Sequence, residues 1–253
     1  MAFLTSRIES IHGNWKSYDA PRDTCSLLNE ISLRFQIGID MLNPSKGDVI
    51  LDLGCGEFAV LEKSIACFCD EILALDINPQ ALMKAKSNSL FNVHFIGASV
   101  AALPFKSKCV NKIAALELIE HLSKEIEGSF FKEAKLVLKE SGYLVISTPN
   151  DSNVLINLLD PHWLTGHRHY RLKFLEEQLM YNGFEVQTVQ LLGGIIEALC
   201  YVFYLTWHLF WSHLLKRKEP PMPFQRATHK LSALDYSRLG VSSTHIFLRA
   251  VKA

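Results

Sequence analysis

The sequence predicts an α/β protein in which helices cover both faces of a mostly parallel sheet. Two observations carry this prediction. Residues 49–58 read as a buried strand that runs through a glycine turn into a helix. Beyond them, strand and helix patterns alternate along the chain, and such alternation implies parallel strands joined by right-handed crossovers.

The remaining elements follow from apolar periodicity and from residues that start or stop helices. Asn78 can cap a helix that begins at Pro79, and Gly142 and Gly183 are expected to end two others. Strands are predicted at about 72–76, 93–96, 112–117, 143–147, 184–191 and 245–251, and the helices ending at those glycines at 123–140 and 172–182.

The chain divides into four segments. Residues 1–45 form an N-terminal arm that ends in a helix over 24–42, and residues 46–191 form the core. Residues 192–242 are an apolar helical insertion, and residues 243–253 supply the last core strand. A length of 253 residues suits one α/β domain with an appendage.

Composition limits the function classes. Lysine and arginine number 26, as do aspartate and glutamate, so no electrostatic footprint for nucleic acid is visible. The six cysteines are scattered and lack zinc or redox spacing, which fits reduced thiols in a cytoplasmic protein. Charged residues follow Met1 too soon for a secretory signal, so we expect no secretion.

The glycine turn predicts a nucleotide-like ligand, because Gly54 and Gly56 allow the backbone to approach closely. With Ala59 and with Asp76 about 20 residues on, the turn also fits a dinucleotide fingerprint. Asp52 argues against a pyrophosphate, since like charges ~4 Å apart repel by about 4 kcal/mol at an effective dielectric of ~20. A cationic nucleoside is favoured, and a nicotinamide-dependent oxidoreductase is the alternative.

These motifs together resemble the class I methyltransferases, whose first motif is commonly (V/I)LDxGCGxG. Asp76 matches the acid that holds the ribose hydroxyls in that family. Leu103-Pro104-Phe105 and residues 116–122 resemble the "LPF" and "EVLEHL" blocks of its small-molecule O-methyltransferase branch, typified by ubiquinone-biosynthesis enzymes. The resemblance implies a Rossmann-like doubly wound sheet of seven strands, with an antiparallel last strand at the sheet edge beside the sixth.

The resemblance also implies S-adenosylmethionine as cofactor. Ligands in such sheets bind beyond the carboxyl ends of the strands. The residues expected to bind the cofactor are Asp52, Gly54, Cys55, Gly56, Asp76, Ile77, Ala98, Ser99 and Glu117.

Four positions depart from the family pattern. Ala98 and Ser99 stand where a Gly-Asp pair usually reads the adenine, and the Ser99 hydroxyl can still accept a hydrogen bond, though a weaker one. Phe58 replaces the third glycine of the first motif, and Asn111 replaces an acid at the start of the fourth strand. The change at Ala98 and Ser99 bears on selectivity for adenine, whereas those at Phe58 and Asn111 remove no group that methyl transfer requires.

Candidate catalytic residues follow the fourth and fifth strands. Methyl transfer needs a base only when the acceptor is a poorly acidic hydroxyl, and His121 could supply it; the alternative is that His121 caps the following helix. The loop 160–170 matches a shorter "GHxRxY/F" of related enzymes over the acceptor. His167 and His169 are expected to contact the acceptor, with plain loop packing as the alternative. No acidic constellation accompanies them, so we expect no metal site.

The apolar run 191–215 is the most unusual feature. On a helix, Glu197, Tyr201, Tyr204, His208 and Ser212 would form one narrow polar stripe. A single bilayer crossing is disfavoured, because residues 245–251 must return to the sheet. The helix is expected to pack over the acceptor, to lie between subunits of a homodimer, or to contact a membrane surface through 194–215, making the protein cytoplasmic or peripheral.

The predicted function is methyl transfer from S-adenosylmethionine to an oxygen of a small acceptor, partly apolar or lipid-linked. A nitrogen or carbon acceptor stays open, and a non-catalytic S-adenosylmethionine-binding module is a further alternative.

Overall fold

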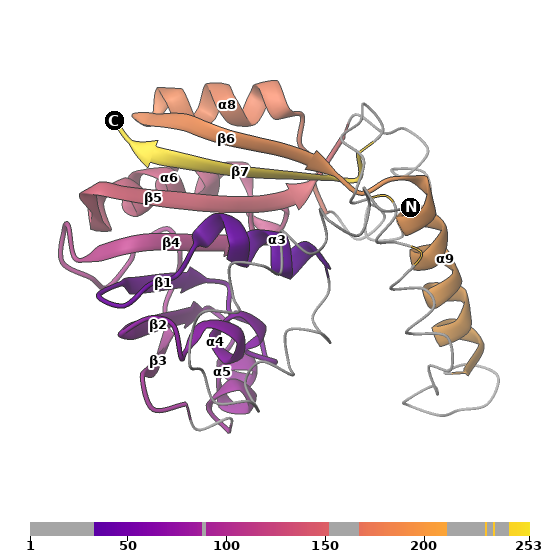
Figure 1. Cartoon of the computed structure of the whole chain (residues 1–253), viewed down its shortest axis with the longest axis horizontal. Coiled ribbons are helices and arrows are strands. Elements are labelled where there is room, and N and C mark those ends of the chain that lie inside the picture. The colour runs from indigo at the N-terminus through magenta and orange to yellow at the C-terminus, as the bar shows by residue number, and fades with distance from the viewer. Residues whose placement is uncertain (1–32, 88–89, 152–166, 212–230, 232–234, 236–242) are drawn as a thin grey trace, which may run out of the picture.

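The fold is a twisted sheet between two layers of helices, as shown by a computed structural model of the chain (Figure 1). The structure describes residues 33–87, 90–151, 167–211, 231, 235 and 243–253. The described residues form a seven-stranded sheet in the order β3-β2-β1-β4-β5-β7-β6. Every pair is parallel except those that β7 makes with β5 and β6. The predicted doubly wound, mostly parallel fold is therefore confirmed.

The strands fall close to their predicted positions. Their bounds are β1 Val49–Leu53, β2 Glu71–Asp76, β3 Val93–Gly97, β4 Val110–Leu116, β5 Leu138–Pro149, β6 Phe184–Leu192 and β7 His245–Lys252. The helices are α3 Leu33–Leu42, α4 Val60–Ile65, α5 Pro79–Lys86, η1 Ile119–His121, α6 Lys124–Val137, α8 Leu172–Tyr181 and α9 Ile195–Leu209.

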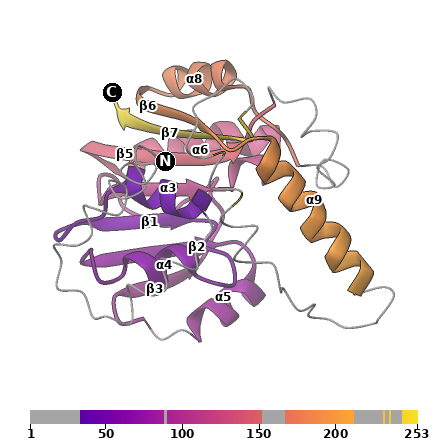
Figure 2. The same ribbon diagram turned by 45° about the vertical axis from the view of Figure 1, so that its right-hand side comes forward.

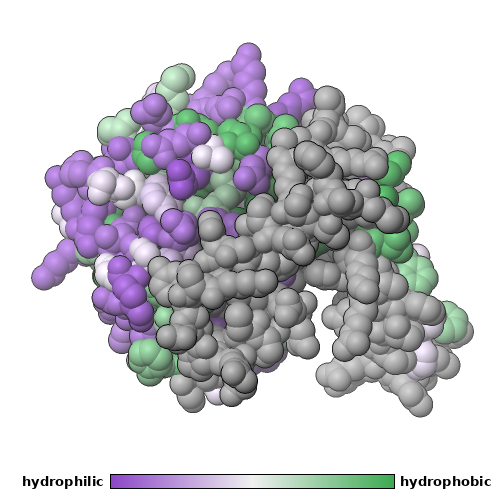
Figure 3. Space-filling model, in the orientation of Figure 1, coloured by the Kyte–Doolittle hydropathy of each residue, from purple (hydrophilic) through white to green (hydrophobic). Residues whose placement is uncertain are grey.

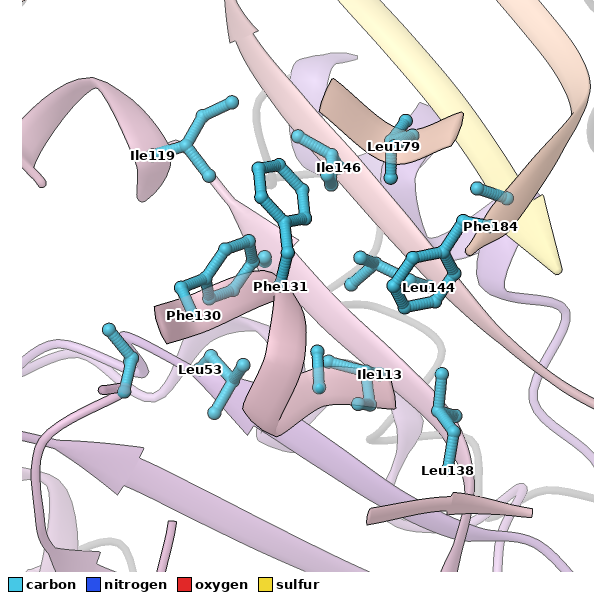
Figure 4. Close-up of a cluster of buried hydrophobic side chains, with 14 of the residues drawn as sticks. Leu53, Ile113, Ile119, Phe130, Phe131, Leu138, Leu144, Ile146, Leu179 and Phe184 are labelled. Carbon is cyan, nitrogen blue, oxygen red and sulfur yellow. The ribbon is translucent and has the colours of Figure 1, made fainter. Parts of the chain in front are cut away.

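The two helical layers enclose separate cores (Figures 1 and 2). The first packs α6 and α8 against the sheet, and fully buried Phe130 and Phe131 lie at its centre (Figure 4). The second packs α3, α4 and α5 against the other face. Since truncation of a buried phenylalanine typically costs about 3–5 kcal/mol, these side chains contribute much of the stability of the first core.

Local capping confirms two predicted helix ends. The Asn78 side chain accepts hydrogen bonds from the N–H groups of Gln80 (2.9 Å) and Ala81 (3.4 Å), and Pro79 is the first residue of α5. Gly183 follows α8 with φ 76°, a backbone conformation that glycine adopts without strain.

The helix predicted over 123–140 is too long. α6 ends at Val137, because Leu138 already pairs with Val110 of β4. Gly142 therefore does not end a helix but lies inside β5. A Cβ there would stand 2.8 Å from the Asn111 carbonyl oxygen, so glycine is required by a close approach of two backbones.

The predicted edge position of the last strand is wrong. β7 runs antiparallel, as expected, but lies between β5 and β6, which leaves β6 at the edge. The sequence explains the exchange: Ile246, Phe247 and Leu248 are consecutive and fully buried, as in an internal strand. β6 alternates apolar residues with the exposed Glu185 and half-buried polar residues, which suits an edge.

The insertion begins with α9, which projects from one end of the sheet (Figures 1 and 2). Among the described residues, no helix is long and apolar enough to cross a membrane. Of the predicted polar stripe, Glu197 is described and is mostly buried, with 14% of its side chain exposed. The side chains of Tyr201, Tyr204 and His208, all of Ser212, and the arm before residue 33 lie outside the described part.

Candidate functional site: a cofactor and acceptor site at the carboxyl edge

The parallel strands bring the predicted cofactor residues to one edge of the sheet. Gly54 follows β1, Asp76 ends β2, Ala98 follows β3 and Glu117 follows β4. The N–H groups of Gly54 and Cys55 donate to the Leu75 carbonyl oxygen at 2.7 and 3.1 Å, which ties the glycine turn to β2. Carboxyl ends of parallel strands are where ligands of open α/β sheets bind.

The glycine turn leaves its backbone open. Gly54 and Gly56 have φ of 80° and 64°. A Cβ on Gly54 would lie 2.9 Å from Leu118 Cδ1, whereas a Cβ on Gly56 would meet nothing within 4 Å. Gly54 thus permits close packing inside the protein, while Gly56 faces open space that a ligand could occupy.

Asp76 is held rigidly beside that space. Its Oδ2 accepts the Gly56 N–H (2.9 Å), and its Oδ1 accepts the Asn78 N–H (2.8 Å). Each carboxylate oxygen keeps a further lone pair, so both remain able to accept a ribose hydroxyl. Ile77, next in the chain, is 73% exposed and offers an apolar surface at the same edge.

Of the other residues predicted to bind the cofactor, two border the site and one has its side chain in the core. Ala98 donates its N–H to the Asp76 carbonyl oxygen (3.2 Å), and Ser99 Oγ accepts the Ala101 N–H (3.2 Å), so both border the site. The Cys55 side chain is buried in the core under α3, α4 and α5, and its burial raises the pKa of the thiol. Any cofactor contact from Cys55 must therefore come from its backbone.

Asp52 and Glu62 form a buried acidic pair beneath the turn. Asp52 is 5% exposed and Glu62 is fully buried. Burial first, and then the neighbouring Glu62 carboxyl, raises the pKa of Asp52 well above its usual value. Burial raises the pKa of Glu62 to about 7, although the neighbouring Asp52 acts to lower it. The pair therefore carries less negative charge than two ordinary carboxylates.

Glu117 is fixed by a network that the sequence did not reveal. Its φ of 53° is unusual for a non-glycine residue. Ser147 Oγ donates to Glu117 Oε1 (2.7 Å), and Arg34 Nη1 donates to Glu117 Oε2 (3.3 Å). His245 Nε2 lies 3.5 Å from Glu117 Oε2 and 3.0 Å from Arg34 Nη1.

Glu197 of α9 closes the network. Its Oε1 lies 3.5 Å from Arg34 Nε and its Oε2 lies 3.7 Å from His245 Nδ1. Thr244 Oγ1 donates to the same carboxylate at 2.5 Å. Residues of α3, β7 and α9 thus meet the end of β4 in one cluster, and the first turn of the insertion is anchored beside the predicted cofactor site.

Charge balance sets the protonation of the cluster formed by Arg34, Glu117, Glu197 and His245. Burial and Arg34 lower the pKa of His245, but Glu117 and Glu197 outweigh both and raise it to about 9. Burial opposes ionisation of the two glutamates, yet His245 and Arg34 lower the pKa of each to about 2. With His245 protonated the cluster is neutral, so His245 does not serve as a base at neutral pH.

Glu120 lies deeper and is protonated at neutral pH. It is 3% exposed, and Thr148 Oγ1 donates to its Oε2 at 3.1 Å. Burial, and after it the Glu117 charge, raises the pKa of Glu120 to about 8. Glu120 therefore contributes a neutral polar group at the carboxyl edge of the sheet, and not a second negative charge beside Glu117.

The structure brings His121 and His167 together. Their ring centroids are 4.2 Å apart, with an edge-to-face angle of 81°. The helix α6 begins after Ser123, at the N-cap position, so the alternative that His121 caps this helix is wrong. His169 is half-buried two residues on, and residues 160–166 of the same loop lie outside the described part.

Two residues between and after the histidines are structural. Arg168 Nη2 pairs with the buried Glu127 Oε2 at 2.7 Å, and Tyr170 donates its hydroxyl proton to the Ile119 carbonyl oxygen or to Glu127 Oε2, both at 2.9 Å. These contacts attach the loop to η1 and α6. They hold His167 over the end of β4, which is why the histidines converge.

Comparison with known proteins agrees with this geometry. A family model described as "Methyltransferase domain" matches residues 44–206, more than half of the chain. A probable S-adenosylmethionine-dependent methyltransferase of Mycobacterium tuberculosis (strain H37Rv) is 33% identical over 101 residues, which cover 40% of this chain and 35% of that protein. The malonyl-[acyl-carrier protein] O-methyltransferase of Marinomonas sp. (strain MWYL1) is 28% identical over 136 residues, covering 53% and 47%.

A solved structure agrees on the fold. The geranyl diphosphate C-methyltransferase of Streptomyces coelicolor A3(2), with Mg²⁺, geranyl diphosphate and S-adenosyl-L-homocysteine, has a TM-score of 0.58 at 13% identity, covering 87% of this chain and 80% of that one. Both curated relatives extend well beyond the aligned part, since less than half of each is matched.

The chain belongs to the methyltransferase domain family and has the class I, Rossmann-like fold. The Mycobacterium relative is named for S-adenosylmethionine, which agrees with the cofactor that the sequence predicts. The open Gly56 backbone and the two available Asp76 oxygens fit a nucleoside ligand of either class. The family match is what favours a methyltransferase over a nicotinamide-dependent oxidoreductase.

Proposed function

We propose that the protein transfers the methyl group of S-adenosylmethionine to an oxygen of a small acceptor that carries an apolar or lipid-linked portion. The observation behind this proposal is the contact between His121 and His167 directly after β4. When bound, the cofactor supplies an electrophilic methyl group. The protein must then orient the acceptor and, for a weakly acidic hydroxyl, accept its proton, which an imidazole can do near neutral pH.

The acidic residues at the carboxyl edge of the sheet are poor candidates for the general base. Glu117 and Glu197 are held ionised by Arg34 and His245, and a low-pKa carboxylate is a weak base. Glu120 already carries a proton near neutral pH. The exposed His121 and half-buried His167 are therefore the better candidates for the base.

The names of two similar proteins support two acceptor chemistries. The Marinomonas relative is named an O-methyltransferase, and it is the more similar in sequence. The Streptomyces structure is named a C-methyltransferase of geranyl diphosphate, and it shares the fold alone. We therefore propose oxygen and make carbon an outcome of the test.

The apolar portion of the acceptor is suggested by α9. Ile195, Leu199 and Phe203, spaced four residues apart, are 52%, 57% and 45% exposed, and Phe210 is 48% exposed on the same helix. Apolar surface follows this helix in the space-filling view, whereas the visible core surface is largely hydrophilic (Figure 3). Glu197 fixes the start of the helix beside Glu117, so this row of exposed apolar residues begins near the predicted cofactor site.

The same row would suit a membrane surface from which an apolar acceptor is drawn. Lys216-Arg217-Lys218 follows in the sequence and would favour anionic lipid. A homodimer that covers the row is the competing outcome. Sedimentation with vesicles containing anionic lipid separates the two, because a dimer interface would leave the protein in the supernatant.

The acceptor can be identified with labelled cofactor. Cell extracts, divided into lipid and aqueous fractions, are incubated with the protein and methyl-labelled S-adenosylmethionine, and labelled products are characterised by mass spectrometry. Label in an ether or ester of the lipid fraction supports the proposal. Label on carbon or nitrogen, or in a wholly polar product, contradicts it.

A further inference from the structure

Glu62 is a buried acid without an ordinary hydrogen-bond donor. It lies on α4, is fully buried, and neither carboxylate oxygen accepts an N–H or O–H from the described residues. An ionised carboxylate in such a place would cost several kcal/mol, so the group must hold a proton or face a cation.

The side chain that Glu62 does meet is another buried acid. Asp52, at the end of β1, is 5% exposed and is the side chain that most influences the pKa of Glu62 after burial, and two carboxyls can share a hydrogen bond only when one carries a proton. The other groups that influence the pair are Asp76, Cys55 and Lys63. Asp76 adds a like charge, Cys55 is a neutral buried thiol, and the half-buried Lys63 is the single cation of the three.

The pair lies beside the predicted cofactor site. Asp52 precedes Gly54 by two residues, and the Asp76 carboxylate that influences Asp52 also accepts the Gly56 N–H. S-adenosylmethionine carries an ammonium and a sulfonium, so its arrival adds positive charge beside a group that holds a dissociable proton. Nearby positive charge favours the ionised form of an acid.

We propose that Asp52 and Glu62 share one proton in the free protein and that binding of S-adenosylmethionine expels it. The proton leaves the O–H bond of the pair and passes to solvent, and the negative charge left on the pair attracts the net positive charge that the cofactor keeps after its own carboxylate is counted. Glu62 is thus a specificity-determining residue that makes this site selective for a cation. The proposal depends on the cofactor and not on the acceptor, so it can fail while the proposed function holds.

Linkage fixes the sign of the pH dependence. Below about pH 7 the free pair is protonated and the bound pair is not, so the affinity for S-adenosylmethionine rises as the pH rises. The increase is at most about tenfold per pH unit and levels off above the pKa of the free pair. A site whose protonation is not coupled to cofactor binding would show no such dependence of affinity on pH.

The experiment is calorimetry of S-adenosylmethionine binding to the full chain, at pH 7, in buffers with different ionisation enthalpies. For the wild type, we expect the binding heat to depend on the buffer, corresponding to release of a substantial fraction of one proton. Glu62→Gln should abolish the release and flatten the pH dependence, because a glutamine amide can donate to an ionised Asp52 at any pH.

Glu57→Gln is the matched control. Glu57 lies in the same turn but is partly exposed and pairs with Lys84, so proton release should be unchanged. A wild-type heat that is the same in every buffer overturns the proposal without any variant. Equal proton release from Glu62→Gln and wild type overturns it as well.

Discussion

Replacing His245 with glutamine should remove a pH-dependent contribution to stability. The folded pKa of about 9 exceeds the ordinary 6.5, because Glu117 and Glu197 outweigh burial and Arg34. The contribution is therefore fully present below pH 6.5 and is lost as the pH rises toward 9. At about 1.4 kcal/mol per pKa unit, the difference is at most about 3 kcal/mol.

The assay is urea unfolding of wild type and His245→Gln at several values between pH 6 and 9.5. The unfolding free energy of the wild type should decrease across this range by up to about 3 kcal/mol more than that of the variant. His94→Gln is the matched control, because His94 is 56% exposed and pairs with Glu71 at the surface. This control should follow the wild-type curve.

Parallel pH curves for wild type and His245→Gln would refute the reasoning. In that case the ring is neutral, its Nε2 accepts a hydrogen bond from Arg34 Nη1 at 3.0 Å, and its Nδ1–H donates to Thr244 Oγ1 at 2.8 Å. The cluster would then carry a net negative charge, and the explanation of its charge balance would be wrong.

Three further predictions concern function. Asp76→Ala should weaken S-adenosylmethionine binding by more than tenfold in calorimetry, because charge-assisted hydrogen bonds worth about 1.5–3 kcal/mol each are lost. Asp70→Ala, at the exposed residue before β2, is the control. An unchanged dissociation constant for Asp76→Ala would remove Asp76 from the site. His167→Ala should lower turnover while sparing affinity for S-adenosylhomocysteine, and a parallel fall in both would make the loop structural. Phe203→Lys should reduce sedimentation with anionic vesicles, whereas Met83→Lys, at an exposed apolar residue of α5, should not; equal behaviour of the two variants would argue against membrane contact by α9.

Local signals predicted where the candidate cofactor residues lie in the fold. Gly54, Gly56 and Asp76 lie at strand ends whose positions follow from apolar runs a few residues long, and a parallel sheet necessarily brings such ends together. The cap at Asn78 was likewise predictable, because it depends on the next three residues alone. Cys55 was the exception within this stretch, since its side chain turns into the core.

Contacts across the chain could not be predicted in the same way. Arg34, Glu197 and His245 surround Glu117 from three elements that are far apart in the sequence. Arg34 alone is 83 residues from Glu117 and 211 residues from His245, and nothing in the local sequence marks these residues. The one available signal was His245 itself, a polar residue at the start of a buried strand. The pairing of Asp52 with Glu62 was missed because it depends on how α4 packs against β1.

The sequence alone determined the class of the protein, since alternating strand and helix patterns and a glycine turn impose a parallel sheet with a ligand at one edge. Tertiary structure decided the place of β7, because strand order depends on which buried edges pair and not on chain order. It also decided the charge states of Asp52, Glu62, Glu120 and His245. A carboxyl or imidazole keeps its ordinary pKa in water, and only burial beside particular neighbours changes it.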